Sequence, residues 1–234
     1  MSSSLAQLNN KISALPFMRF IGLFFFILSL SVYLGHYAYQ YGLNIPPSTS
    51  GDETDYDSIG WELSHGRGYA TNVNDMEFRQ PYLRATQETK INPERFLLDR
   101  SEGSTNVVRP PLFPLLISVT NLFFGRQHWA IRTMNAIAIS ATCGLLVQFV
   151  YRNAGAIPAM LALFLYVCVD IRSRLYGRAI LTEAFSVLLI TLLTLSIIQL
   201  SRTERIRWTL AAGVLMGLAI LTRSMFVLWV PGVS

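Results

Sequence analysis

The sequence predicts an all-α integral membrane protein with about five transmembrane helices and one large outer loop after the first of them. Hydrophobic residues make up 52% of the 234 residues and charged residues only 14%, whereas a soluble domain carries about 25% charged residues. The apolar residues also fall in long runs that approach the roughly 20 residues needed to cross a bilayer. Because backbone polar groups in lipid must be satisfied within the segment, we expect these runs to be helices.

The first span is predicted over residues 17–41, after a short N-terminal segment, residues 1–16. Lys11 and Arg19 beside an apolar run resemble the start of a signal peptide. However, the residues after Gly35 contain no small-x-small cleavage site, and further apolar runs follow. We therefore expect an uncleaved span with a cytoplasmic N-terminus.

Residues 42–128 form a predicted extracytoplasmic loop, which is polar up to residue 109 and too long for a simple connection. Residues 56–64 predict a short amphipathic helix, because Ile59 and Leu63 are four positions apart. Residues 80–105 are weakly patterned and are expected to be irregular.

The loop closes with a Pro-led apolar segment, residues 110–125. Its dozen apolar residues are few for a crossing, so we expect a helix that lies at the membrane interface. Clearer spans follow within residues 129–234, at about 129–151, 156–170, 181–200 and 208–230. This gives five crossings, or six if the Pro-led helix also spans. Arginines in the short loops nearly balance under both counts, so the length of the Pro-led segment favours five.

The net charge of +5 does not indicate nucleic-acid binding, because the arginines gather at predicted membrane edges. Cys143 and Cys168 lie inside apolar runs, so no disulfide framework is predicted. The three histidines are not spaced as a set of metal ligands.

Several charged residues are candidates for a site. Asp52 and Asp55 follow the first span closely, and a carboxylate near low dielectric can accept a proton or hold a divalent cation. The alternative is that they solvate the loop and cap the following helix. Arg109 precedes two prolines that fix an extended backbone, which suits a phosphate. Its alternative is a membrane anchor.

Glu183 begins one apolar run and Arg223 lies within the last one. Ionisable residues in spans are costly and often mark a site. With five crossings both residues fall on the side of the large loop. A simple salt bridge between them is the main alternative.

Taken together, these segments resemble the GT-C membrane glycosyltransferases that use polyprenyl-phosphate sugar donors, including protein O-mannosyltransferases and lipid A aminoarabinose transferases. The matching elements are Asp52-Glu-Thr-Asp-Tyr56, Gly66-Arg-Gly-Tyr69, Arg109-Pro-Pro-Leu-Phe-Pro114, Arg132-x-x-Asn135, Leu181-Thr-Glu-Ala-Phe185 and Gly217-Leu-Ala-Ile-Leu-Thr-Arg223. They occur in the family's order and cover most of the chain.

The resemblance implies that Asp52 is the catalytic carboxylate that activates the acceptor. It also implies substrate-binding roles for five residues: Glu53, Tyr56, Arg109, Glu183 and Arg223. The implied partners are the bilayer, a polyprenyl-phosphate-linked sugar donor and an acceptor that is a lipid, a glycan or a protein. The resemblance requires no cofactor. A divalent cation stays open, and Val108, where the aminoarabinose transferases have an acidic residue, removes the support that this family would give to a metal.

Family members are usually longer, so the chain is expected to be the N-terminal part of such an enzyme and poorly active alone. The expected location is the bacterial plasma membrane. Two other functions remain open: a transporter or flippase with Glu183 and Arg223 along its pathway, and a non-catalytic membrane subunit. The absence of duplicated halves disfavours the transporter.

Overall fold

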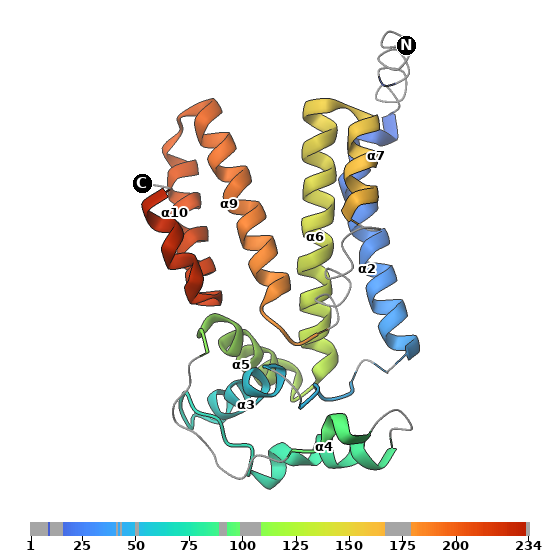
Figure 1. Cartoon of the computed structure of the whole chain (residues 1–234), viewed down its shortest axis with the longest axis vertical. Helices are drawn as coiled ribbons and strands as arrows, with labels where there is room; N and C mark the ends of the chain where they lie inside the picture. Colours follow the sequence, from blue (N-terminus) through green and yellow to red (C-terminus); the bar gives the residue numbers. More distant parts are fainter. Residues whose placement is uncertain are drawn as a thin grey trace.

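The computed structural model describes residues 9, 16–40, 42, 44–49, 52–88, 93–98, 109–166 and 179–232. Every regular element within these ranges is a helix, which confirms the predicted all-α class. The helices form two parts: a bundle of long apolar helices, and a layer of shorter helices across one end of it (Figure 1). We call this end the loop end.

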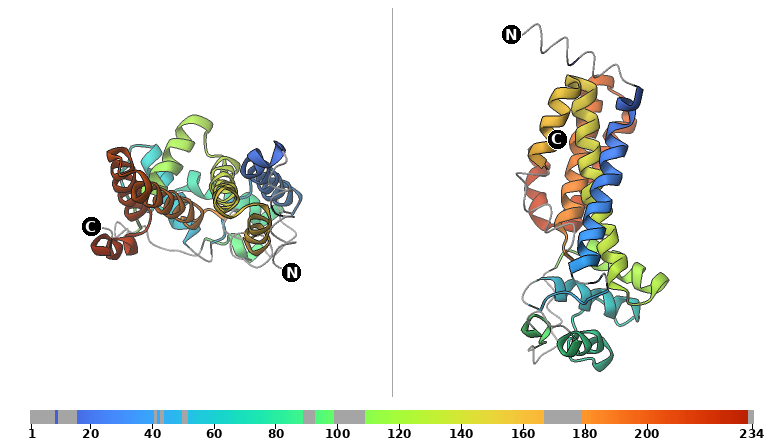
Figure 2. Two further views of the ribbon diagram at one scale, coloured as in Figure 1. Left: turned by 90° about the horizontal axis from the view of Figure 1, so that it is seen from above. Right: turned by 90° about the vertical axis from the view of Figure 1, so that its right-hand side faces the viewer.

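The bundle contains η1 (Pro16–Phe20), α2 (Ile21–Gln40), α6 (His128–Ala154), α7 (Ala156–Phe164), α9 (Glu183–Thr203) and α10 (Ile206–Thr222). Helices α10, α9, α6 and α2 lie side by side in that order, and α7 packs on α6 (Figures 1 and 2). Met18–His36, α6 and α9 are each long and apolar enough to cross a membrane. The protein is therefore an integral membrane protein.

The described bundle helices run in both directions between its two ends, and the division into five spans stays a prediction. Helix α2 runs towards the loop end, α6 away from it, α9 away from it and α10 back towards it (Figure 1). Helix α7 begins at the far end of the bundle, and α9 begins at the loop end (Figure 1). The predicted span at 156–170 starts with α7, but its residues 167–170 lie outside the described residues.

Two glycines allow α2 and α6 to approach closely. A Cβ atom added to Gly22 would lie 2.6 Å from the carbonyl oxygen of Gly144, and a Cβ on Gly144 would lie 2.6 Å from that of Gly22. The backbone N–H of Gly22 also donates to Gln148 Oε1 at 3.1 Å. Such contacts between small residues are a usual basis of helix association in membranes.

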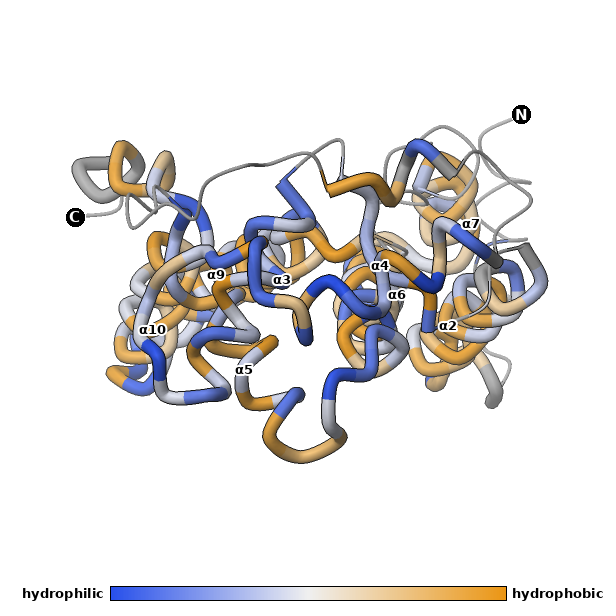
Figure 3. The backbone as a smooth tube through the Cα atoms, turned by 90° about the horizontal axis from the view of Figure 1, so that it is seen from below, coloured by the Kyte–Doolittle hydropathy of each residue, from blue (hydrophilic) through white to orange (hydrophobic). Residues whose placement is uncertain are grey.

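The loop layer contains α3 (Glu53–Ser64), α4 (Met76–Glu88), η2 (Pro93–Phe96) and α5 (Leu112–Phe124). Hydrophilic residues gather along this layer, whereas the bundle helices behind it are mainly hydrophobic (Figure 3). Helices α3 and α5 touch at Gly60, where a Cβ would lie 2.3 Å from Ile117 Cγ2. Only a glycine therefore fits this crossing without a shift of one helix.

Helix α3 starts at Glu53, three residues before the predicted start at residue 56. The prediction of an irregular segment over residues 80–105 is wrong for α4. Phe78, Tyr82 and Ala85 of this helix are buried at the spacing of one helical face. Pro81 inside α4 concealed this pattern, because proline normally disfavours a helix interior.

Helix α5 is the Pro-led segment. Its 13 residues span about 20 Å, which is short for a crossing. Phe113 and Ile117 are buried, whereas Leu122 and Phe123 are exposed by 67% and 80%. The helix projects from the side of the bundle (Figure 2). An apolar face open beside the bundle fits the predicted interfacial position.

The last predicted span, residues 208–230, is divided. Helix α10 ends at Thr222, Arg223 has an extended backbone (φ −147°, ψ 115°), and a 3-10 helix, η4 (Ser224–Gly232), follows. Arg223 therefore lies at the loop end of α10 and not inside a continuous span. Keeping the guanidinium at a helix end avoids the cost of burying it in hydrocarbon.

Candidate functional site

The six predicted site residues lie around the junction between the loop layer and the bundle. Four come from the loop layer: Asp52, Glu53 and Tyr56 at the start of α3, and Arg109 just before α5. Two come from the bundle: Glu183 at the start of α9 and Arg223 at the end of α10. Both bundle residues face the loop end, as the five-span prediction required (Figure 1).

Arg109 joins two carboxylates of α3. Its Nη2 lies 2.6 Å from Asp52 Oδ1 and 2.8 Å from Asp55 Oδ2, and its Nε donates to the same Asp55 oxygen at 3.2 Å. Tyr69 fixes the backbone beneath it, because the phenol donates to the carbonyl oxygen of Arg109 at 2.7 Å. The Asp52 side chain is 53% exposed, against 14% for Asp55. Asp52 is therefore the accessible acid of this cluster.

The proposed alternative role of Asp52 as a helix cap is not seen. Asp52 occupies the N-cap position of α3 but makes no side-chain capping hydrogen bond. Its carboxylate instead pairs with Arg109. Asp55 was a candidate carboxylate together with Asp52, but its pairing with Arg109 was not predicted. Its spacing of three from Asp52 places both on one helix face.

Tyr56 lies between the two groups of charges. Its ring is 5.8 Å from the guanidinium carbon of Arg109 and packs edge-on against Phe113 at 5.4 Å. Its phenol shares a hydrogen bond with the Thr182 side chain. Burial raises the pKa of Tyr56, and Asp52 and Glu183 add to this effect, whereas Thr182 and Arg109 oppose it. The phenol is thus a neutral hydrogen-bonding group at ordinary pH.

Glu53 connects the loop layer to the bundle. Its Oε2 accepts the backbone N–H of Ile180 at 3.3 Å, immediately before α9. Next to this contact, Arg223 Nη1 lies 3.3 Å from Glu183 Oε1. The salt bridge that was the alternative for Glu183 and Arg223 is therefore formed. Arg223 nevertheless keeps 40% of its side-chain surface exposed.

Two further residues of the matching elements hold this junction together. Arg132 is only 4% exposed and donates to the carbonyl oxygen of Ile45. Asn135 donates to the carbonyl oxygens of Ala179 and Leu181. Helix α6 thereby fixes both the segment after α2 and the start of α9.

A second charged cluster lies on another side of α3 and is buried. Asp57 is fully buried, and its Oδ2 accepts Arg126 Nη2 at 2.7 Å and the Tyr82 hydroxyl at 3.0 Å. His128 Nε2 lies 3.4 Å from the same oxygen. Burial opposes ionisation of Asp57, but Arg126 and His128 outweigh it and hold the pKa of Asp57 well below its usual range.

Aromatic rings enclose the Arg126 side chain. Its guanidinium carbon lies 4.1 Å from the ring centroid of Phe78 and 4.9 Å from that of Trp61. Such contacts stabilise a desolvated guanidinium. No sequence pattern indicated this cluster, because Asp57 and Arg126 are 69 residues apart.

Within the described ranges, no group of three or more His, Cys, Asp or Glu side chains is placed to hold a metal ion. Asp52 and Asp55 are instead both engaged with Arg109. A divalent cation therefore stays an open prediction.

Comparison with known proteins gives one match. The family model described as dolichyl-phosphate-mannose-protein mannosyltransferase matches residues 108–233, more than half of the chain. These residues include Arg109, Glu183 and Arg223 but not the carboxylates at the start of α3. No curated protein and no solved structure matches.

Proposed function

Because the chain belongs to the dolichyl-phosphate-mannose-protein mannosyltransferase family, a GT-C family, we propose that it transfers a sugar from a polyprenyl-phosphate donor with inversion at the loop end. The family uses polyprenyl-phosphate sugar donors, so the protein is a glycosyltransferase of that general kind. The acceptor class stays open among lipids, glycans and proteins.

The observation that carries this proposal is the junction itself. An accessible carboxylate, Asp52, lies against the guanidinium of Arg109, and a second guanidinium, Arg223, belongs to the same end of the bundle. Acceptor activation needs a base, and departure of a phosphate needs positive charge. In this proposal Asp52 is the base, and Arg109 and Arg223 are the positive charge.

The proposed step is a single displacement. The acceptor oxygen attacks the anomeric carbon, its proton passes to Asp52, and the bond from that carbon to the phosphate oxygen breaks. The polyprenyl phosphate leaves with the electron pair, and Arg109 and Arg223 neutralise its charge. Attack opposite the leaving group inverts the anomeric carbon.

The contacts between Asp55 and Arg109 allow Asp52 to separate from Arg109 and act as a base. Asp55 holds the guanidinium through both Nε and Nη2. Arg109 thus stays in position when the Asp52 side chain turns to an acceptor hydroxyl. We assign Asp55 the role of a positioning residue, and Tyr56 and Glu183 the role of contacts to the donor.

The orientation of the protein is also part of the proposal. Arg152, Arg202 and Arg205 lie at the end of the bundle opposite the loop layer. Arg19, beside the first span, lies at this end too, and a positive residue before an uncleaved first span favours a cytoplasmic N-terminus. The loop end then faces outward and the N-terminus is cytoplasmic, as expected for a plasma-membrane enzyme that uses an outward-facing lipid donor.

The test is the replacement Asp52→Asn in the full chain in native membranes, with transfer measured from a polyprenyl-phosphate mannose donor. We expect turnover to fall by roughly 10²–10⁴-fold, because the general base is lost. Glu77→Gln, an exposed carboxylate on α4, is the matched control and should keep full turnover. Unchanged turnover in Asp52→Asn would remove Asp52 from this role.

A further inference from the structure

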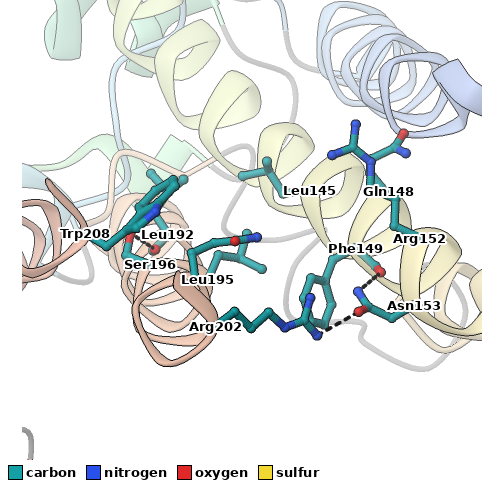
Figure 4. Close-up of a pocket in the computed structure, with 11 residues that line it drawn as sticks. Leu145, Gln148, Phe149, Arg152, Asn153, Leu192, Leu195, Ser196, Arg202 and Trp208 are labelled. Atoms are coloured by element: carbon teal, nitrogen blue, oxygen red, sulfur yellow. Dashed lines mark hydrogen bonds between the residues drawn. The ribbon is translucent and has the colours of Figure 1, made fainter. Parts of the chain in front are cut away.

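A pocket lies at the end of the bundle opposite the loop layer, between α6, α9 and the first turn of α10 (Figure 4). Its volume is about 380 Å³, which falls within the roughly 300–1,000 Å³ usual for small-ligand sites. It is separate from the candidate site, because α9 has 21 residues and separates the two ends by about 30 Å.

The lining changes from apolar to cationic along both helices. On α6 the order is Leu145, Phe149 and then Arg152, and on α9 it is Leu192, Leu195 and then Arg202. Both helices run away from the loop end, so the arginines lie near the predicted cytoplasmic surface (Figure 1). Among the described residues, none that lines the pocket carries a carboxylate. This gradient matches a molecule with an apolar chain and an anionic head.

The polar atoms around the pocket leave donors available. Arg202 reaches from α9 to Asn153 Oδ1 on α6 at 2.8 Å, at one side of the pocket (Figure 4). Arg152, drawn at another edge of the view, has no ion-pair partner within the described part of the chain. The Trp208 Nε1 is buried and has no hydrogen-bond partner there either. A buried donor without a partner is costly unless a ligand accepts its proton.

We propose that this pocket binds an anionic phospholipid of the cytoplasmic leaflet. The phosphate diester accepts hydrogen bonds from Arg152, Arg202 and Trp208, and one acyl chain lies along the apolar part. Basic pockets between spans on the cytoplasmic side commonly bind anionic headgroups. This lipid differs in role from the sugar donor, because it occupies the other end of the bundle.

The experiment is native mass spectrometry of the full chain in detergent, with phosphatidylglycerol, phosphatidylcholine or inorganic phosphate added separately. The unmodified protein should retain phosphatidylglycerol at least about tenfold more strongly than phosphatidylcholine. Both lipids carry the phosphate diester, but the quaternary ammonium of phosphatidylcholine cancels its charge and is repelled by Arg152 and Arg202. The double variant Arg152→Gln/Arg202→Gln should lose this preference. Trp208→Phe, which keeps the ring but removes the donor, should weaken retention by roughly two- to fivefold.

The matched control is Arg19→Gln/Arg205→Gln, which removes two charges from the same end of the bundle without touching the pocket. It should keep the preference for phosphatidylglycerol. Equal retention of both lipids by the unmodified protein would overturn the proposal, as would survival of the preference in the pocket double variant. Displacement of the lipid by an equal concentration of inorganic phosphate would indicate a site for free phosphate and would also overturn it. If the double variant does not fold, the lipid comparison and Trp208→Phe decide.

Discussion

Helix α3 carries two acid–guanidinium clusters that share their chemistry and differ in burial. On one side, Asp57 and Arg126 have side chains exposed by 0% and 7%. On the other, Asp52 and Arg109 are exposed by 53% and 30%. A buried pair must satisfy every charge within the protein, whereas an accessible pair can exchange its partner for a substrate. Burial therefore separates a structural cluster from a candidate site on the same helix.

The surroundings reinforce this contrast. The rings of Phe78 on α4 and Trp61 on α3 enclose the guanidinium of Arg126, which lies between α5 and α6. These contacts connect α3 and α4 to the turn between α5 and α6. The Arg109 guanidinium contacts only the ring of Tyr56, and its Nη1 makes no hydrogen bond within the described ranges. Arg126 is thus shut off from solvent, although its Nε and Asp57 Oδ1 have no hydrogen-bond partner among the described residues. Arg109 is partly exposed and keeps a donor for a phosphate oxygen.

The largest effect is expected from Arg126→Met. The variant leaves Asp57 charged and unpaired in the interior, so the free energy of unfolding should fall by about 3–5 kcal/mol. Tryptophan fluorescence during denaturant unfolding measures this loss, and a variant with Phe at positions 129, 208 and 229 assigns the signal to Trp61, whose ring contacts Arg126. The double variant Asp57→Asn/Arg126→Met should recover part of the loss. A midpoint equal to that of the unmodified protein would show that the cluster is not structural.

Arg109→Gln should give the opposite result. Its ion pairs are partly exposed, so the free energy of unfolding should change by no more than about 1 kcal/mol. Sugar transfer should fall by roughly 10²–10³-fold, because a positive charge opposite the leaving phosphate is lost. Arg109→Lys keeps the charge but not the planar fork, and should retain an intermediate rate. If Arg109→Gln unfolds as readily as Arg126→Met, the distinction between the two clusters fails.

The sequence predicted the parts of this fold that depend on local composition. Run length and polarity were enough to place the spans that became α2, α6 and α9, and the short apolar run of α5 was correctly separated from them. The structure also brings Asp52, Arg109 and Tyr56 together, which motif order suggested. The spans and α5 were predictable because each needs only neighbouring residues or a fixed membrane thickness. The approach of Asp52 and Arg109, 57 residues apart, was suggested only by the family resemblance.

Features that depend on distant contacts were not predictable. The burial of α4 requires Trp61 and Arg126 to form its other side, so its sequence alone looked irregular. Arg223, at the end of α10, pairs with Glu183, 40 residues earlier in the chain. The role of Asp55 depends on where Arg109 lies, 54 residues later. Each of these three features depends on a charged residue whose partner is remote in the sequence.

The smallest effect is expected from acid, because the carboxylates near the buried side of α3 titrate only below about pH 4. Burial raises the pKa of Asp75, but hydrogen bonds from Arg67, from the backbone of Glu77 and Phe78 and from Trp61 lower it overall to about 2, against an ordinary value of 3.8. The pKa of Asp57 is lower still. A depressed folded-state pKa stabilises the protein above the ordinary value, and this stabilisation is lost as the pH falls towards the folded value.

The denaturation midpoint reported by Trp61 should therefore stay level from pH 6 to about 4 with respect to these two groups and decline between about 4 and 2. Asp75→Asn should start with a lower midpoint at pH 6 and show a flatter decline, because one of the two titrating groups is gone. Asp52→Asn serves as the control from the accessible cluster and should keep the slope of the unmodified protein. A midpoint that rises between pH 4 and 2 would contradict the charge assignment of Asp57 and Asp75, and with it the view that α3 is held by ionised, buried carboxylates.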